Sequence, residues 1–271
     1  MALLPAADKD NFLTDLGAAP AYPIPVVAPP PTGLVARELR FRGFGPFHLT
    51  VPTAACLGLS GPSGAGKTLL LRSLADLDPH EGTVTLDGTA QHALPGPAWR
   101  RQVGLLPADT LWWHDHVGPH FEPRRDTDGH ASREPPGSGP STTDSCAQAL
   151  ISVPSRSSAF SDSGNSVAGW IADLGFEPDV LDWPVSRLSA GERQRLGILR
   201  LLSRRPRCLL LDEPTANLDP DSTARVERLI TDYRQSERVP VLWVGHSREQ
   251  LARVADTRLH LEAGKLQGVD S

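Results

Sequence analysis

The residues best suited to chemistry form a glycine-rich segment, residues 61–68, with the sequence Gly-Pro-Ser-Gly-Ala-Gly-Lys-Thr. The segment follows the pattern G-x-x-x-x-G-K-[ST], which cradles the phosphates of a nucleotide. Glycines let the backbone wrap a phosphate so that several N–H groups point inward, and a following helix adds the positive end of its dipole. We therefore expect this segment to grip a triphosphate.

Each part of the segment has an expected role. Lys67 reaches the β- and γ-phosphates, and Thr68 offers its hydroxyl to Mg²⁺. Ser63 and Gly64 are expected to lie against the phosphate chain. The predicted nucleotide-contacting residues are Gly61, Pro62, Ser63, Gly64, Ala65, Gly66, Lys67 and Thr68.

A pair of adjacent carboxylates, Asp212 and Glu213, follows the aliphatic run 208–211. A buried strand would deliver Asp212 to its carboxyl edge, where it can hold Mg²⁺ directly or through water. Glu213 is then placed to accept a proton from, or to orient, the water that attacks the γ-phosphorus. Many strands end in solvated acids, so it is the position downstream of the phosphate-binding segment that favours the catalytic interpretation.

The elements around these residues alternate in their periodicity. Strands are predicted at the short apolar runs 54–60, 83–86, 103–106, 208–211 and 239–244. Helices are predicted where apolar residues recur at helical spacing, at 68–77, 167–174, 190–202 and 222–234. Upstream, residues 34–51 predict two strands joined by a Gly-Pro turn at Gly45 and Pro46. The alternation indicates an α/β fold with a mainly parallel sheet.

Composition sets limits on the function. A chain of 271 residues with a formal net charge of -5 has no electrostatic footprint for nucleic acid or for an anionic membrane surface. No apolar run reaches the roughly 18 residues that span a bilayer, so a membrane role would depend on another polypeptide. The amino terminus lacks the pattern of a secretory signal. The three cysteines, Cys56, Cys146 and Cys208, cannot close a disulfide framework and favour a reducing cytosolic compartment.

Two segments do not look like parts of a folded core. Residues 1–33 are rich in Ala and Pro, and residues 122–166 are rich in Ser, Pro, Gly, Asp and Arg with few aliphatic side chains. Such segments cannot bury enough apolar surface to offset the entropy of ordering. We interpret 1–33 as a disordered tail and 122–166 as a disordered insertion within one domain at 34–267.

Three further motifs carry a resemblance to a known family. Residues 188–195, Leu-Ser-Ala-Gly-Glu-Arg-Gln-Arg, resemble the signature motif of ABC ATPases, with Ala190 where glycine is usual. This motif separates ABC proteins from other P-loop NTPases. Residues 214–219 resemble the family's D-loop, and His246 resembles its switch histidine, which contacts the γ-phosphate. The motifs occur in the family's order, and the resemblance covers about residues 34–267.

The resemblance implies a P-loop NTPase core with a mainly parallel sheet, a small antiparallel β subdomain and an α-helical subdomain that carries the signature motif. It also implies that two cassettes pair head to tail, so that ATP on one phosphate loop is capped by Ser189 and Gly191 of the other. Asp219 would take part in communication across that interface. Either Phe41, the first candidate, or Phe44 would stack on adenine, unless both are core residues.

One departure from the family concerns the Q-loop, where Ala108 occupies the place of the expected glutamine. Alanine can neither coordinate Mg²⁺ nor sense the γ-phosphate, so either Asp109 substitutes or hydrolysis is slower or differently gated. The residues that follow are expected either to be exposed, to receive the coupling helix of a membrane subunit, or to be buried in the helical subdomain. These residues are Trp112, Trp113, Val117 and Phe121.

The expected protein is the ATP-binding and hydrolysing subunit of an ABC transporter, with ATP and Mg²⁺ as ligands and Lys67, Glu213 and His246 as catalytic residues. Its expected partners are a transmembrane permease subunit and a second cassette, most simply in a homodimer, on the inner face of the cell membrane. No nucleic-acid partner is expected, because the arginines near the signature helix suggest a solvated face. The alternatives are a soluble ABC ATPase acting on nucleic acid or ribosomes, and a weakly hydrolysing, nucleotide-sensing regulatory subunit.

Overall fold

The computed structural model of the chain describes residues 32–121 and 166–269. The predicted tail and insertion therefore lie outside the described residues except at their edges. Gly33 belongs to a strand, where it pairs with Pro52, and Ser166 caps a helix by accepting a hydrogen bond from the backbone N of Gly169 at 3.1 Å. The structured domain thus includes one residue more than predicted at each of these two boundaries.

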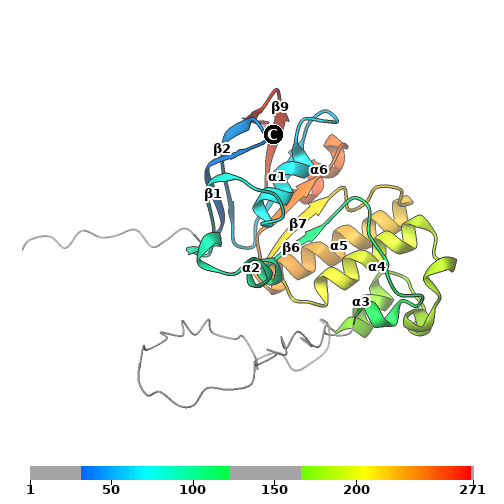
Figure 1. Ribbon diagram of the computed structural model, residues 1–271. Coiled ribbons are helices and arrows are strands. Elements are labelled where there is room, and N and C mark those ends of the chain that lie inside the picture. The colour runs from blue at the N-terminus through cyan, green and yellow to red at the C-terminus, as the bar shows by residue number, and fades with distance from the viewer. Residues whose placement is uncertain (1–31, 122–165, 270–271) are drawn as a thin grey trace, which may run out of the picture. The chain divides into compact units, whose positions relative to one another are not determined.

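The glycine-rich segment 61–68 and the carboxylates Asp212 and Glu213 lie at the ends of strands of a six-stranded sheet, several strands of which are labelled in Figure 1. Its strands, in the spatial order β10-β9-β3-β8-β7-β6, are β10 (Lys265–Gly268), β9 (Thr257–Glu262), β3 (Cys56–Ser60), β8 (Val241–Val244), β7 (Cys208–Asp212) and β6 (Val103–Leu106). All neighbours are parallel except β9 and β10, which form an antiparallel hairpin. The carboxyl ends of β3, β7 and β8 consequently meet at one edge of the sheet.

The central strands are apolar throughout because both faces of the sheet are covered. Side chains alternate between faces, so Cys208 and Leu210 enter one core cluster and Leu209 and Leu211 the other. Helices α1 (Lys67–Leu74) and α2 (Gly96–Gln102) pack in the first cluster. The second contains residues of α3 (Val167–Asp173), α4 (Ala190–Leu202), α5 (Pro220–Ser236) and α6 (Arg248–Val254). In Figure 1, α4 and α5 run side by side beside β6 and β7.

A second, four-stranded antiparallel sheet packs in the cluster that contains α1. Its order is β2-β1-β4-β5, with β1 (Gly33–Phe41), β2 (Phe44–Pro52), β4 (Glu81–Leu86) and β5 (Thr89–Ala90). The turn between β1 and β2 is Arg42 and Gly43, at φ 45° and 82°. Gly45 and Pro46, the predicted turn, lie inside β2, because the adjacent pair Arg42-Gly43 adopts the left-handed conformations that a tight hairpin needs.

The predicted fold class, α/β with a mainly parallel sheet and a small antiparallel subdomain, is confirmed. The predicted helix at 190–202 has the observed bounds, whereas α1 ends at Leu74 rather than at residue 77, because Asp76 takes φ 58° and leaves the helix. Five further elements, α2, α6, β5, β9 and β10, were not predicted, because they are short or of mixed polarity. The remaining turns of helix are η1 (Gln91–Ala93), η2 (Gly118–His120), η3 (Pro178–Asp182) and η4 (Val185–Arg187).

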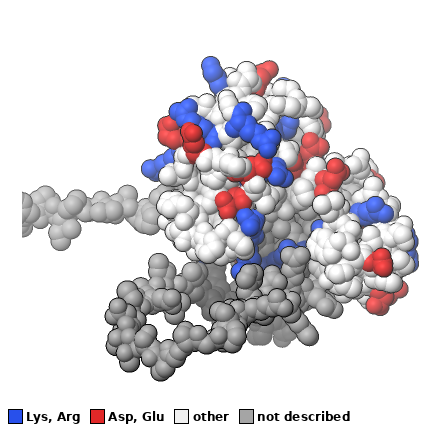
Figure 2. Space-filling model, viewed as in Figure 1, with Lys and Arg blue, Asp and Glu red and all other residues white. Residues whose placement is uncertain are grey.

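Surface charge is mixed on the face shown in Figure 2, where Lys and Arg are interspersed with Asp and Glu. Within residues 32–121 and 166–269, no helix is both long and apolar enough to cross a bilayer. Cys56 and Cys208 are buried in the sheet, and burial raises the pKa of both thiols. These two cysteines are therefore packing residues rather than nucleophiles.

Candidate active site at the phosphate loop

The phosphate loop connects β3 to α1, and its shape depends on two glycines. Gly61, at φ 151°, passes so close to the backbone of β9 that a Cβ there would lie 2.3 Å from the carbonyl oxygen of Leu261. Gly66, at φ 99°, is the N-cap residue of α1, and a Cβ there would lie 3.4 Å from the ring of Phe44. Only glycine fits these positions, so the loop has the tight backbone that a phosphate cradle requires.

Lys67 lies inside this loop, with 7% of the residue exposed. Its Nζ donates hydrogen bonds to the carbonyl oxygens of Gly61 at 2.9 Å and Pro62 at 3.0 Å. The loop therefore holds the ammonium group with neutral acceptors, and no described carboxylate forms an ion pair with it. A phosphate oxygen would be a stronger, charged partner for the same group.

Thr68 and Asp212 connect the phosphate loop to the central strand. The Thr68 hydroxyl donates to Oδ2 of Asp212 at 2.7 Å. Asp212 is only 4% exposed, and burial raises the pKa of its carboxyl, whereas the hydrogen bond from Thr68 opposes that shift. Two oxygen donors at this distance suit Mg²⁺, a hard cation that usually keeps phosphate and water ligands as well. Among the described residues, no group of three or more His, Cys, Asp or Glu could hold a metal alone, so other oxygens would have to complete the shell.

Glu213 and His246 follow β7 and β8, and they meet at the same edge of the sheet. Nε2 of His246 lies 2.7 Å from Oε1 of Glu213. Glu213 has φ 49°, a left-handed conformation that is uncommon for a residue with a Cβ, and its backbone N donates to the carbonyl oxygen of Val244 at 3.1 Å. Such strain costs about 1–3 kcal/mol and concentrates at functional sites. It turns the Glu213 side chain away from the strand direction and toward His246.

The second residue of the signature segment, Ser189, is the N-cap residue of α4. A capping box joins Ser189 to Glu192: the backbone N of Ser189 donates to the Glu192 carboxylate at 2.8 Å, and the backbone N of Glu192 donates to the Ser189 hydroxyl at 3.2 Å. The start of α4 approaches the D-loop closely, since a Cβ on Gly191 would lie 3.2 Å from Leu218. Asp219 caps α5 by accepting from the backbone N of Ser222 at 2.8 Å. In the described part of one chain, no hydrogen bond joins Ser189 to the phosphate loop.

The first candidate for adenine stacking, Phe41, does not fit that role. It is 3% exposed, with ring centroids of Phe44 and Phe47 at 5.8 and 5.4 Å, because residue 41 of β1 points into the core. Phe44 is half-buried, and its ring lies against Gly66 of the phosphate loop. The structure therefore favours Phe44, the second candidate, over Phe41.

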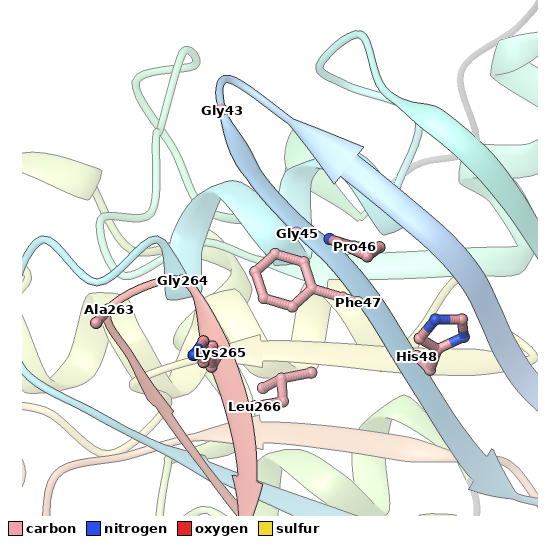
Figure 3. A pocket seen from close by; sticks show the side chains of 9 residues that line it. All are labelled: Gly43, Gly45, Pro46, Phe47, His48, Ala263, Gly264, Lys265 and Leu266. Carbon is pink, nitrogen blue, oxygen red and sulfur yellow. The ribbon is translucent and has the colours of Figure 1, made fainter.

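An open cavity of about 580 Å³ lies between the β1–β2 turn and the β9–β10 turn (Figure 3). Gly43 and Gly45, the chain neighbours of Phe44, contribute to its wall, together with Lys265 and Leu266 of the opposite hairpin. Neither Phe44 nor any residue of the phosphate loop is among the residues that line this cavity.

The chain after β6 departs from the sheet and packs on α4. Ala108 and Asp109 are exposed. A Cβ on Gly197 of α4 would lie 2.5 Å from the methyl group of Thr110, and the Thr110 hydroxyl donates to the carbonyl oxygen of Arg193 at 3.4 Å. That Asp109 replaces the missing glutamine stays a prediction, because no contact joins it to the residues around Asp212.

A buried imidazole organises the loop that follows. His120, 2% exposed, accepts hydrogen bonds at Nε2 from the backbone N of Trp113 at 3.0 Å and of His114 at 3.1 Å. Its Nδ1 lies 3.0 Å from the carbonyl oxygen of His116 and 3.2 Å from that of Val117, and is therefore the protonated nitrogen. Burial lowers the pKa of His120, which keeps the ring neutral. Sequence reasoning had no signal for this role.

The aromatic residues of this loop divide between surface and core. Trp113 is 55% exposed and Leu111 is 75% exposed, whereas Val117 is fully buried and Trp112 packs at the edge of the core. Phe121 is also partly buried against the core. The guanidinium group of Arg200 stacks on both tryptophans, 4.7 and 4.9 Å from their ring centroids, and burial lowers its pKa to about 10. Arg200 and also Arg195, which stacks on Phe176, are thus packing residues, contrary to the expected solvated face.

Two glutamines near the site were also missed. Gln194, 6% exposed, donates from Nε2 to the carbonyl oxygen of Glu213 at 3.5 Å. Gln250 donates to the Thr215 hydroxyl at 2.8 Å and to the Glu227 carboxylate at 2.9 Å. Gln194 thus contacts the backbone of Glu213, and Gln250 contacts the side chain of Thr215, two residues farther along the chain. Gln194 lies within the signature segment, but no sequence pattern marked Gln250.

Comparison with protein families decides the classification. The family model described as ABC transporter matches residues 44–216, which include the phosphate loop, the signature segment and the strand-end carboxylates. The chain belongs to the ABC transporter family. This membership agrees with the order of motifs in the sequence and with the arrangement of the two sheets.

Similar ABC proteins include Protein STAR1 of Oryza sativa subsp. japonica, 34% identical over 225 residues that cover 80% of this chain and 55% of that protein. Methionine import ATP-binding protein MetN 1 of Pseudomonas putida is 30% identical, with 82% of this chain and 59% of that protein covered. The chain thus spans little more than half the length of these relatives. Among solved structures, a bacterial Atm1-family ABC exporter with ATP bound has a TM-score of 0.63 at 22% identity, covering 93% of this chain and 41% of that one, which supports the fold.

Proposed function

We propose that this chain binds and hydrolyses Mg²⁺-ATP as the ATPase cassette of an ABC transporter. The observation that carries the proposal is the 2.7 Å hydrogen bond between Thr68 and Asp212. This bond brings the start of α1 and the end of β7 together, so the phosphate loop and the strand-end carboxylates form one site. Two motifs that are far apart in the sequence would have no reason to meet in this way in a protein that merely contained a glycine-rich turn.

The side chains divide the work by position. When ATP binds, Nζ of Lys67 would donate to the β- and γ-phosphates in place of the loop carbonyl oxygens to which it donates in the structure. Thr68 and Asp212 would hold Mg²⁺, which when bound would neutralise charge on the phosphates. Glu213 accepts a proton from the attacking water at its carboxylate, and His246, 2.7 Å away, orients that carboxylate and reaches the γ-phosphate. Catalysis is thus mostly positioning and electrostatic stabilisation.

The base and sugar would extend from the phosphate loop toward Phe44, whose chain neighbours Gly43 and Gly45 line the cavity of Figure 3. Phe44 is already in contact with the phosphate loop at Gly66, so a base that stacks on its free side would remain connected to phosphates in the cradle. Phe41 is too deeply buried to take this part.

The proposed partners are a second copy of the cassette and a transmembrane permease subunit. Ser189 and Gly191 are placed at the start of α4, where the backbone N–H groups of a helix favour an anion, and the second copy would present them to ATP. Leu111 and Trp113 form an exposed apolar surface that suits docking by a permease on the inner face of the membrane. Support comes from the relative named as a methionine import ATP-binding protein.

Steady-state phosphate release tests the activity. Glu213→Gln should lose at least about 100-fold in turnover, the usual effect of losing a general base, while it still binds ATP and forms a stable dimer in its presence. Asp232→Asn, an exposed acid on α5, serves as the matched control and should keep wild-type turnover. Undiminished hydrolysis by Glu213→Gln would contradict the assigned role.

One observation favours a second candidate function. Ala108 provides no side-chain ligand where the family has glutamine, which would suit a nucleotide-sensing regulatory subunit with little hydrolysis. The same assay separates the two, because a sensor binds ATP without measurable turnover. An integral membrane protein that co-purifies with the chain would support the transporter role over a soluble ABC ATPase.

A further inference from the structure

A second cavity, of about 170 Å³, lies on the opposite side of β3 from the strands that carry the carboxylates. It is formed by the end of β3, by β9, by α6 and by the chain after β10. The residues that line it are Ser60, Arg248, Leu251, Arg258, His260 and Val269. None of them has a role in the nucleotide chemistry proposed above.

The polar side chains of this cavity carry an excess of positive charge. Within the described residues, neither Arg248 nor Arg258 makes a side-chain hydrogen bond or an ion pair, although most arginines of this protein do. His260 contacts Ser60 through Nδ1 at 2.9 Å, and Glu262 is the acid that faces its Nε2, at 3.8 Å. Two unpaired guanidinium groups beside one weakly engaged carboxylate leave the cavity able to accept an anion.

The rest of the wall is aliphatic. Leu251 is 2% exposed and so forms a fixed apolar surface, while Val269 is 40% exposed. A planar guanidinium fork matches a carboxylate in geometry, and the adjoining leucine and valine favour a hydrocarbon group on the same ligand. The volume is larger than a simple oxyanion needs and too small for a nucleotide.

We propose that this cavity is a binding site for a small carboxylate with a short branched or linear aliphatic group. Arg248 and Arg258 bind the carboxylate, and Leu251 and Val269 contact the aliphatic part. The site is separate from the ATP site, although Ser60 directly precedes Gly61 of the phosphate loop and Arg248 follows His246 by two positions.

Isothermal titration calorimetry of the full chain with isovalerate, without nucleotide, tests the proposal independently of any ATPase activity. We expect saturable binding that Arg258→Gln weakens at least tenfold, while Arg228→Gln, an exposed arginine of α5, leaves it unchanged. Arg248→Gln should also weaken isovalerate binding. Because Arg248 is exposed, this second variant should fold normally even if Arg258→Gln does not. The neutral analogue 3-methylbutan-1-ol should bind at least tenfold more weakly than isovalerate.

Three results would overturn the proposal. The first is the absence of saturable isovalerate binding by the wild-type chain. The second is equal binding of the alcohol, which would mean that the arginines do not recognise charge. The third is sulfate binding as tightly as isovalerate, which would mean that the aliphatic wall contributes nothing and the site is only a weak general anion site.

Discussion

The phosphate loop and the loop at 107–121 both leave the carboxyl end of a strand in the same sheet, but they are held in different ways. The phosphate loop is fixed by glycine conformations and by contacts with neighbouring strand ends, such as the bond from Thr68 to Asp212. In the 107–121 loop, the buried ring of His120 lies within hydrogen-bonding distance of four backbone groups between residues 113 and 117, and Thr110 and Arg200 add hydrogen bonds between the loop and α4. The first loop depends mainly on backbone shape, and the second depends on side-chain hydrogen bonds, among which those of the neutral His120 imidazole are the most buried.

The two loops would serve different partners, ATP at the phosphate loop and a permease at the 107–121 loop. The groups that would hold ATP are rigid, because each is anchored to a strand or a helix start. Of the two residues that would face a permease, Trp113 is held by a hydrogen bond from its backbone N to His120, which protonation of that ring nitrogen would break, whereas the carbonyl oxygen of Leu111 accepts from Arg200 at 2.8 Å. We therefore expect changes at His120 to affect the stability of the docking loop and leave ATP affinity almost unaltered.

The largest effect on stability is expected for His120→Phe. Phenylalanine keeps the contacts of the ring with Trp112 and Trp113 but leaves the backbone N–H groups of Trp113 and His114 without their acceptor. Each unsatisfied buried group costs about 1–3 kcal/mol. Urea denaturation should show a loss of about 2 kcal/mol in the free energy of unfolding, with ATP affinity within twofold of wild type.

His92→Phe is the matched control, because His92 is an exposed histidine in η1. It should change neither quantity. If His120→Phe lost ATP affinity in proportion to stability, the two loops would be energetically coupled, which contradicts their independence.

Phe44→Ala is expected to affect ATP affinity rather than stability. Loss of the ring beside Gly66 should weaken ATP binding about tenfold, or about 1.4 kcal/mol, through lost stacking on the base. Phe41→Leu, in the core beneath it, should instead lower stability by about 1 kcal/mol and leave ATP affinity unchanged. Equilibrium binding of a fluorescent ATP analogue measures both variants, and equal losses of affinity would contradict the assignment of Phe44.

The smallest effect concerns pH. Burial lowers the pKa of His120, and Arg200 and His114 add positive charge nearby. The unfolded chain, in which the ring has its ordinary pKa near 6.5, then binds the proton more readily than the folded chain. The contribution of His120 to stability is therefore constant above pH 6.5 and falls as the pH drops below it. Between pH 6.5 and 5, the free energy of unfolding of His120→Phe should decrease less steeply than that of the wild type. Equal pH dependence in the two proteins would contradict a neutral buried imidazole.

The phosphate loop and the strand-end carboxylates could be predicted from the sequence alone, because these motifs lie at fixed offsets from strands and helices. Asp212 and Glu213 follow an aliphatic run, and α4 begins with a capping box whose pattern, Ser189 followed three residues later by Glu192, is visible in the sequence. The role of His120 was not predictable, because its partners are backbone groups brought together by turns without regular periodicity. Phe41 and Phe44 were indistinguishable in the sequence, since the hairpin turn at Arg42 and Gly43 decides which ring faces the core.

The most direct test of the central claim is equilibrium ATP binding by the wild-type chain and by Lys67→Ala. Among the described residues, Nζ of Lys67 hydrogen-bonds to two carbonyl oxygens of the phosphate loop and forms no ion pair, so Lys67→Ala should leave the fold intact and weaken ATP binding by roughly 100-fold, or about 2.7 kcal/mol. Arg228→Ala, a change of the same charge on exposed α5, should bind as the wild type does. Affinity for ATP within threefold of wild type in Lys67→Ala would contradict the assignment of residues 61–68 as the phosphate-binding loop.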